Sequence, residues 1–177
     1  MLPAVGRKIR NQGRRWRLSG RKEGNMELMV RAFEELTCAQ LYELLKARVD
    51  VFVVEQKCAY AELDNCDQRA VHVWLEDERG LAACLRVMDR GVRHEEVSIG
   101  RVLSLRRHCG LGRRILSEGI RVAREHFGAR KIYLEAQTAV RALYEEQGFV
   151  AISGEFLEDG IAHVRMMLVL PQEDGKR

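Results

Sequence analysis

The chain has 177 residues, of which 46% are hydrophobic and 32% are charged, and its formal net charge is +4. This length corresponds to about one domain on a prior of roughly 150 residues per domain, and the composition excludes a disordered or fibrous protein. The unbroken apolar runs are far shorter than the roughly 18 residues that a membrane-spanning helix needs, so we exclude an integral membrane protein.

The basic excess is confined to the start of the chain. Residues 1–25 contain six arginines and two lysines against the single acid Glu23, and the remaining residues are mildly acidic in total. A nucleic-acid-binding surface needs a basic patch on a folded face, and the sequence after residue 25 has no such stripe. We therefore expect no nucleic-acid partner for the folded domain.

We interpret residues 1–25 as a disordered leader, because they show almost no apolar periodicity and because Met26 opens a strand-like pattern that suits a natural start. A transit peptide and a basic tail that contacts nucleic acid are the alternatives. The folded domain is expected to span residues 26–171, and a polar tail is expected at 172–177.

The hydrophobic pattern predicts the elements of this domain in chain order. Alternating apolar residues predict strands, and apolar residues spaced by three and four predict helices. The first helix begins at Thr37 and reaches Phe52, and the polar residues 56–70 predict an ordered loop. The predicted strands are 26–33, 71–76, 81–88, 97–105, 131–136, 149–156 and 162–170, and the other predicted helices are 110–127 and 139–147. This order, without a repeat or a linker, predicts one mixed α/β sheet.

The cysteines give no sign of a metal site or a disulfide framework. They are odd in number, form no Cys-x-x-Cys pair and show no Cys/His spacing typical of metal ligands. We therefore assign neither metal nor disulfide and expect a reducing cytoplasm. The five residues are Cys38, Cys58, Cys66, Cys84 and Cys109.

The sharpest functional signal is the turn between the strand 97–105 and the helix after it. Arg107, Gly110 and Gly112 form the pattern Arg-x-x-Gly-x-Gly, and the helix begins at once. The glycines let the backbone approach a ligand closely, and the helix start presents unpaired N–H groups and a positive dipole end. The turn therefore predicts a pyrophosphate site. The third glycine of a dinucleotide fingerprint and the lysine of a Walker motif are missing.

This turn resembles the (Gln/Arg)-x-x-Gly-x-(Gly/Ala) pyrophosphate loop of the GNAT N-acetyltransferase superfamily. Residues 142–149 resemble the (Leu/Phe)-Tyr-x-x-x-Gly-Phe segment of the same family. The segments 51–56, 98–102 and 158–163 resemble its ElaA-like branch. Each motif is weak alone, but together they follow the family's order over nearly all of residues 27–170.

The resemblance implies a fold of the α+β kind. It implies one GNAT-type domain whose central sheet is mixed, mostly antiparallel and splayed in the middle, with about four flanking helices. Acetyl-CoA would enter the splay as co-substrate, with its pantetheine on the backbone of one strand and its pyrophosphate on the glycine turn. The cofactor-binding residues so implied are Val102, Leu103, Ser104, Arg107, Gly110, Leu111, Gly112, Arg113, Gln137 and Tyr144.

Tyr144 carries a second implied role, as the acid that protonates the departing CoA sulfur. A phenol has an ordinary pKa near 10, so it stays protonated at neutral pH and can donate a proton to a thiolate. The alternative is an aromatic residue that only packs under Phe149. Gln137 stands where the family often places an asparagine that bonds the cofactor.

The general base is left open by the resemblance. Many family members carry a glutamate where this chain has Ser98. Glu55, at the end of the first helix, is the first candidate, and an exposed helix-end carboxylate is its alternative interpretation. His72 and His163 are further candidates, although a lone strand histidine is more often structural.

Three other polar residues receive structural interpretations. Asp64 and Asp67 could attract a cationic amine, but loop aspartates mostly make local turns, and we prefer that interpretation for both. Cys109 lies within the arginine-rich turn, where its thiol could be reactive, and we interpret its position as incidental.

The predicted function is transfer of an acetyl group from acetyl-CoA to a primary amine by direct attack in a ternary complex. The acceptor is a small-molecule amine, an aminoacyl compound or a protein amine. A non-catalytic acyl-CoA sensor is the alternative, and nucleic-acid binding through residues 1–25 is a second one. We expect no membrane partner, and the resemblance admits a homodimer.

Overall fold

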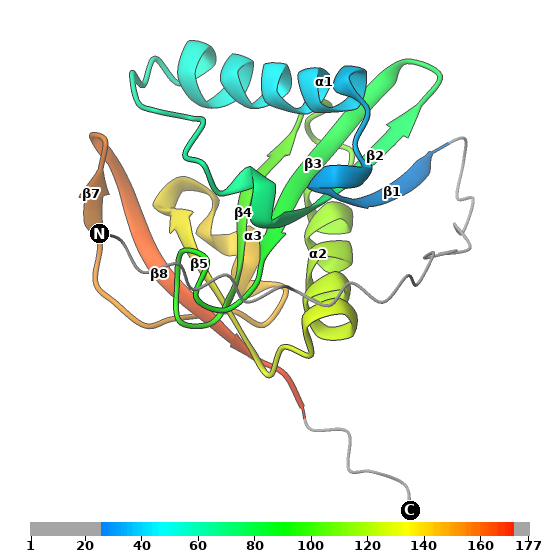
Figure 1. Cartoon of the computed structure of the whole chain (residues 1–177). Helices are drawn as coiled ribbons and strands as arrows, with labels where there is room; N and C mark the ends of the chain where they lie inside the picture. Colours follow the sequence, from blue (N-terminus) through cyan, green and yellow to red (C-terminus); the bar gives the residue numbers. More distant parts are fainter. Residues whose placement is uncertain (1–25, 172–177) are drawn as a thin grey trace, which may run out of the picture.

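The computed structural model describes residues 26–171, so the leader predicted at 1–25 and the tail predicted at 172–177 lie outside the described residues (Figure 1). Eight strands of the described range form one sheet in the order β1-β2-β3-β4-β5-β8-β6, with β7 paired to β8. Every pairing is antiparallel except that of β4 with β5. The mixed, mostly antiparallel sheet is therefore confirmed. The strands are β1 (Glu27–Ala32), β2 (Ala70–Asp77), β3 (Gly80–Met88), β4 (Val97–Ser104), β5 (Lys131–Gln137), β6 (Val150–Ala151), β7 (Phe156–Glu158) and β8 (Ile161–Val169).

The number of helices is slightly lower than expected, because the described residues contain three α-helices instead of about four. These are α1 (Cys38–Arg48), α2 (Leu111–Phe127) and α3 (Arg141–Glu145). Thr37 caps α1: its hydroxyl accepts from the Gln40 amide at 3.2 Å, and the Gln40 side chain accepts from the Thr37 amide at 3.0 Å. The helix predicted to reach Phe52 continues instead as a π-helical segment, Val49–Glu55.

The predicted strand 149–156 is wrong as a continuous element, because it is split into β6 and the start of β7. The Ser153 hydroxyl accepts the hydrogen bond of the Arg165 amide at 3.0 Å and donates to the Gly154 carbonyl at 2.8 Å. A side chain therefore takes the place of a backbone partner there, and the ladder is interrupted. The predicted helix 139–147 is likewise shorter, with a 3₁₀ turn before α3.

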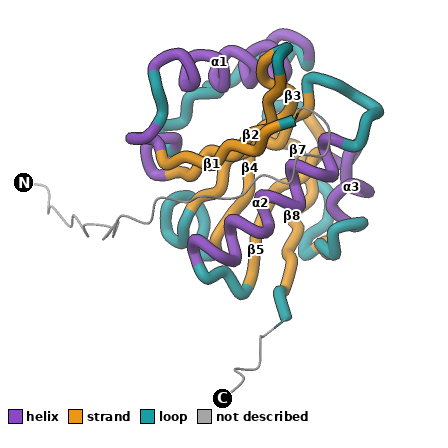
Figure 2. Tube along the Cα trace, turned by 90° about the vertical axis from the view of Figure 1, so that its right-hand side faces the viewer, coloured by secondary structure: helices purple, strands orange, loops and turns teal. Residues whose placement is uncertain are grey.

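The sheet separates two apolar cores, because alternate residues of a strand face opposite sides. On one face Leu85 and Ile99 belong to the core that includes residues of α2. On the other face Trp74 and Cys84 pack with Leu44 of α1. Figures 1 and 2 accordingly show α1 and α2 on opposite sides of the strands. No helix of residues 26–171 is both long and apolar enough to cross a membrane.

The sheet opens in its centre, between β4 and β5. Their described pairing is limited to Val97 with Ile132 and Ser98 with Tyr133. Beyond this point the register of β4 on β3 shifts, and Arg101 adopts a left-handed backbone with φ of 54°. A bulge of this kind bends a strand and increases its twist. The bulge therefore accompanies the separation of β4 from β5 that the resemblance implies.

The packing of α2 on the sheet depends on a close approach at Gly119. A Cβ atom there would lie 2.7 Å from one terminal carbon of the buried Leu85. We expect Gly119→Val to lower the free energy of unfolding by about 1–3 kcal/mol through overpacking, as measured by urea denaturation. Arg124→Val, at an exposed site of the same helix, is the control for β-branched helix propensity. Equal stability of the two variants would contradict the close approach.

Candidate functional site

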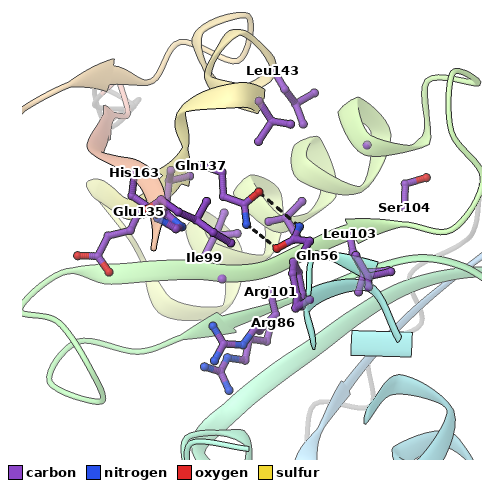
Figure 3. Close-up of a pocket in the computed structure, with 18 of the residues that line it drawn as sticks. Gln56, Arg86, Ile99, Arg101, Leu103, Ser104, Glu135, Gln137, Leu143 and His163 are labelled. Atoms are coloured by element: carbon purple, nitrogen blue, oxygen red, sulfur yellow. Dashed lines mark hydrogen bonds between the residues drawn. The ribbon is translucent and has the colours of Figure 1, made fainter. Parts of the chain in front are cut away.

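A cavity of about 1000 Å³ lies at the opening between β4 and β5. Residues of both strands line it. Further lining comes from the π-helical segment and the loop after that segment, from the turn before α2, from α3 and from the β7–β8 turn. Figure 3 shows side chains from these separate parts of the chain converging on one space. Most of the residues predicted for the cofactor line it, namely Val102, Leu103, Ser104, Arg107, Gly110, Leu111, Gly112, Gln137 and Tyr144.

The glycine turn lies at one end of the cavity. Gly110 has φ of 76°, a left-handed conformation that a side chain would strain, and α2 begins at the next residue. No side chain of the described residues caps this helix start. Arg107 forms an ion pair with Glu55, and both side chains are about half exposed. The first turn of α2 thus presents backbone N–H groups to an anion, with a cation beside them.

Two neighbours of the turn are directed elsewhere. Arg113 pairs with Glu146 on the exposed surface and is absent from the cavity lining. Cys109 is exposed, contacts the Arg106 carbonyl and is also absent from the lining. Arg106 itself is held by Asp77 at the end of β2. Of the arginines at the turn, Arg106 and Arg107 line the cavity, and Arg107 is the more exposed of the two and therefore the better placed to meet a ligand.

The β4 wall of the cavity is formed largely by backbone. Beyond Ser98, β4 has no strand partner on its β5 side among the described residues, so the peptide groups on that edge are available to a ligand. Val102 and Leu103 line the cavity just after the bulge at Arg101. The Ser104 hydroxyl donates to the Arg106 carbonyl at 2.7 Å, which connects the end of β4 to the turn.

Tyr144 lies in α3, on the opposite side of the opening. Its side chain is buried and lines the cavity, and its ring meets Phe149 edge-on at 6.2 Å between centroids. Burial raises the pKa of Tyr144 to about 12. The residue thus packs against Phe149 and also faces the cavity as a protonated phenol.

Gln137, at the end of β5, forms a side-chain pair with Gln56. The Gln137 amide donates to Gln56 at 2.9 Å, and the Gln56 amide donates back at 3.4 Å (Figure 3). Gln56 follows the π-helical segment, so the pair joins two chain segments across the cavity. Sequence analysis included Gln56 in a family motif but gave it no role.

The interpretation as local turn formers is incomplete for Asp64 and wrong for Asp67. Asp64 does accept from the nearby Cys66 amide at 3.1 Å, but it also accepts from Arg86 at 2.8 Å. Asp67 accepts from Arg48 at 2.7 Å and from Arg86 at 2.9 Å. Burial alone would raise the pKa of both carboxyls, and the arginines outweigh it and hold each pKa below its usual range.

Glu62 extends this network to the bulge of β4. Its carboxylate is almost fully buried, and it accepts from Arg48 at 2.5 Å and from Arg101 at 2.9 Å. The Arg101 guanidinium also lies over the Tyr60 ring, 5.4 Å from its centroid. The loop between α1 and β2 is therefore tied to the bulge by charge. Sequence analysis missed Glu62, because its partners are 14 and 39 positions away.

The candidate bases are separated by the fold. Ser98 is buried and lines the cavity, and its hydroxyl has no partner among the described residues. Glu55 lines the cavity but is bound to Arg107. His72 is buried against the Asp67 carbonyl and does not line the cavity, and burial lowers its pKa. His163 lines the cavity, and its Nδ1 lies 2.9 Å from the Ile161 carbonyl.

Metal ligands do not gather in the described part of the chain: residues 26–171 contain no group of three or more His, Cys, Asp or Glu that could hold an ion. All five cysteines lie in this range and are free thiols.

Comparison with known proteins assigns the fold to a family. The model of the acetyltransferase (GNAT) domain matches residues 38–170. A UPF0039 protein of Schizosaccharomyces pombe is 36% identical over 150 residues, which are 82% of this chain and 99% of that protein. A crystal structure of an acyl-CoA N-acyltransferase from Pseudomonas aeruginosa is 37% identical, with a TM-score of 0.75 over 81% of this chain and 99% of that one. The crystal structure of Escherichia coli ElaA is 31% identical, with a TM-score of 0.76 over the same shares.

The arginine–carboxylate network gives the protein a specific acid sensitivity. The pKa of Asp67 is lower in the folded state than in the unfolded state. The ionised Asp67 carboxylate therefore stabilises the folded state above the pKa of the unfolded state, near 3.9, and this contribution is lost as the pH falls below that value. We expect Asp67→Asn to lower the free energy of unfolding by about 3–5 kcal/mol at pH 7 and to flatten its decline below about pH 4. Denaturant unfolding across pH measures both effects.

Asp50→Asn is the matched control, because Asp50 pairs with Lys46 at an exposed site. Exposed pairs contribute about 0–1 kcal/mol, so this variant should behave nearly as the parent. An Asp67→Asn protein as stable as the Asp50→Asn protein at pH 7 would contradict a structural role for the network.

Proposed function

The chain belongs to the GNAT acetyltransferase family, and from this premise we propose that it transfers an acetyl group from acetyl-CoA to a primary amine. Acyl transfer in general follows from the family. The choice of acetyl-CoA and of an amine is our proposal. The observation that carries it is one cavity that joins the glycine turn, the unpaired edge of β4 and the buried phenol of Tyr144.

The residues of the cavity fit acetyl-CoA in three respects. The left-handed Gly110 and the uncapped start of α2 suit a pyrophosphate, with Arg107 as its cation. The free backbone edge at Val102 and Leu103 suits the amide groups of pantetheine. Gln137, at the end of β5, offers a side-chain amide to the cavity. We propose that these residues bind the co-substrate, together with Ser104, Leu111 and Gly112. Arg113, which pairs with Glu146 outside the cavity lining, stays a prediction.

The proposed chemistry is direct attack of a neutral amine on the thioester carbonyl. Holding both reactants in one cavity replaces a bimolecular encounter by an oriented one. Backbone N–H groups at the bulge of β4 would stabilise the oxyanion, since preorganised donors act where charge develops. Tyr144, whose pKa is raised to about 12 by burial, would give its proton to the departing sulfur.

The acceptor is proposed as a small-molecule or peptide amine. The assignment of Glu55 as the general base stays a prediction. Its ion pair with Arg107 places the Glu55 carboxylate beside the glycine turn. The cytoplasmic location and the homodimer stay predictions as well.

Arg107 provides the test of the co-substrate site. We expect the full chain to bind acetyl-CoA and CoA in isothermal titration, and Arg107→Ala to weaken both by about 10- to 100-fold, as expected for loss of a charged hydrogen bond worth about 1.5–3 kcal/mol. Arg124→Ala, at the far end of α2, is the control. Absence of binding to either compound would leave the glycine turn as a helix start and would refute the proposal.

Tyr144 separates an enzyme from an acyl-CoA sensor. Tyr144→Phe removes the proton donor but keeps the buried ring, so kcat should fall by about 10²- to 10⁴-fold while the Kd for acetyl-CoA stays unchanged. Release of free CoA thiol in the presence of an amine measures turnover. Tyr42→Phe, on the exposed face of α1, is the matched control. Unchanged turnover of Tyr144→Phe would exclude the acid role.

A further inference from the structure

We propose that His163 is the general base that takes the proton of the acceptor amine. This inference deepens the proposed function and rests on it. An alkylammonium ion is not a nucleophile, so the reaction needs a proton acceptor on the amine side. Many family members carry a glutamate at the position of Ser98. The Ser98 hydroxyl remains protonated at neutral pH and has no partner among the described residues.

The position of His163 follows from its strand. In β8 it lies opposite Gln137 of β5, and cross-strand partners present their side chains on the same face of a sheet. The Gln137 amide reaches Gln56 across the cavity, so the imidazole lies on the cavity side as well. Figure 3 shows His163 beside Gln137 and Glu135, on the opposite side of the drawn region from Ser104.

One ring nitrogen of His163 has its role fixed by a neighbour. Nδ1 lies 2.9 Å from the Ile161 carbonyl oxygen, and a carbonyl oxygen only accepts, so Nδ1 carries the hydrogen. In the neutral ring Nε2 therefore holds the lone pair. The centroid of the Phe156 ring lies 6.1 Å from that of the imidazole, and the two ring planes are inclined by 32°. The imidazole is thus oriented as a base before any substrate arrives.

Charged groups that line the cavity near the amine side, or pair with groups that do, come from five parts of the chain. They are Glu135 of β5, Arg165 of β8, Glu158 at the end of β7, Asp159 of the β7–β8 turn, and Arg93 and His94 of the loop before β4. The three carboxylates line the cavity and give it negative charge, which favours an incoming ammonium ion. Arg165 and Arg93 oppose this in part, at 3.5 Å from Glu135 and Glu158 respectively.

The other candidates are less well placed. Glu55 forms an ion pair with Arg107 at the glycine turn. His72 is buried under Asp67 and does not reach the cavity. His94 lines the cavity, but its ring packs against Tyr133 with centroids 4.4 Å apart, and burial lowers its pKa. His94 is therefore the rival that an experiment must separate from His163.

Nε2 of His163 removes one proton from the ammonium ion and leaves a neutral amine. The amine nitrogen forms a bond to the thioester carbon, and the carbon–sulfur bond then breaks with its electron pair on sulfur. Sulfur takes the Tyr144 proton, and the phenol regains one from the newly acylated nitrogen through water. His163 releases its proton to solvent, so the products are the amide, CoA thiol and one proton.

The first test reads the imidazole directly and needs no acceptor. In the full chain labelled with ¹⁵N-histidine, long-range ¹H–¹⁵N spectra at neutral to mildly alkaline pH should show one histidine with Nδ1 protonated and Nε2 bare, and the signal should vanish in His163→Asn. An Nε2–H tautomer for His163 would overturn the proposal, because that nitrogen could not accept a proton.

The second test measures turnover against pH. CoA thiol release from acetyl-CoA is followed with ethanolamine, 1,4-diaminobutane and lysine as probe amines. His163→Asn keeps an N–H for the Ile161 carbonyl but removes the base, so kcat/KM should fall by about 10²- to 10⁴-fold and its decline at acid pH should disappear. The Kd for acetyl-CoA should not change. Imidazole added to His163→Ala should restore part of the rate.

Three controls separate the possible failures. His126→Asn, on an exposed site of α2, should leave turnover and pH profile unchanged. If kcat/KM no longer declined at acid pH in His94→Asn while His163→Asn stayed fully active, His94 would be the general base and the proposal would be overturned. A loss of turnover in Glu55→Gln, with the histidine variants active, would overturn the proposal and assign the base to Glu55. A parent protein that binds acetyl-CoA but releases no thiol with any probe would refute the proposed function itself, and the inference with it.

Discussion

The parting of β4 from β5 after two residue pairs is the constraint on which the rest of the site depends. A bulge with Arg101 in a left-handed conformation marks the point at which β4 bends. Such conformations cost about 1–3 kcal/mol and persist where the surroundings hold them. Here the Arg101 side chain is held by the buried carboxylate of Glu62, so the loop after α1 supports the geometry of the central strand.

The buried charges around that loop join it to three other parts of the fold. Removing two charges from water costs about as much as their attraction returns, so a buried ion pair is by itself weak evidence for stability. Glu62, Asp64 and Asp67 each bind at least two arginines. The loop that forms one wall of the cavity is thereby fixed to α1, to β3 and to the bulge of β4.

The segment that follows α1 connects the two ends of the cavity. Glu55 contacts Arg107 at the glycine turn, and its neighbour Gln56 contacts Gln137 at the end of β5. A ligand at the turn and a ligand at the end of β5 would therefore meet consecutive residues of one chain segment. The π-helical segment before Glu55 places these two side chains, and helical irregularities of this kind are frequent at functional sites.

The sequence alone determined the elements and the glycine turn, because both depend on neighbours in the chain. Apolar periodicity predicted the strands and α2 to within a few residues, and the motifs around Gly110 and Tyr144 predicted the family. It could not predict the division of the strand after Phe149, where a serine side chain replaces a backbone partner. The tertiary structure alone decided the ion pairs of Glu62 and Asp67, and it placed His163 opposite Gln137 at the cavity. The arginine partners of the two carboxylates lie on α1, β3 and β4, and the chemistry of a polar residue depends on which groups the fold brings within hydrogen-bond distance.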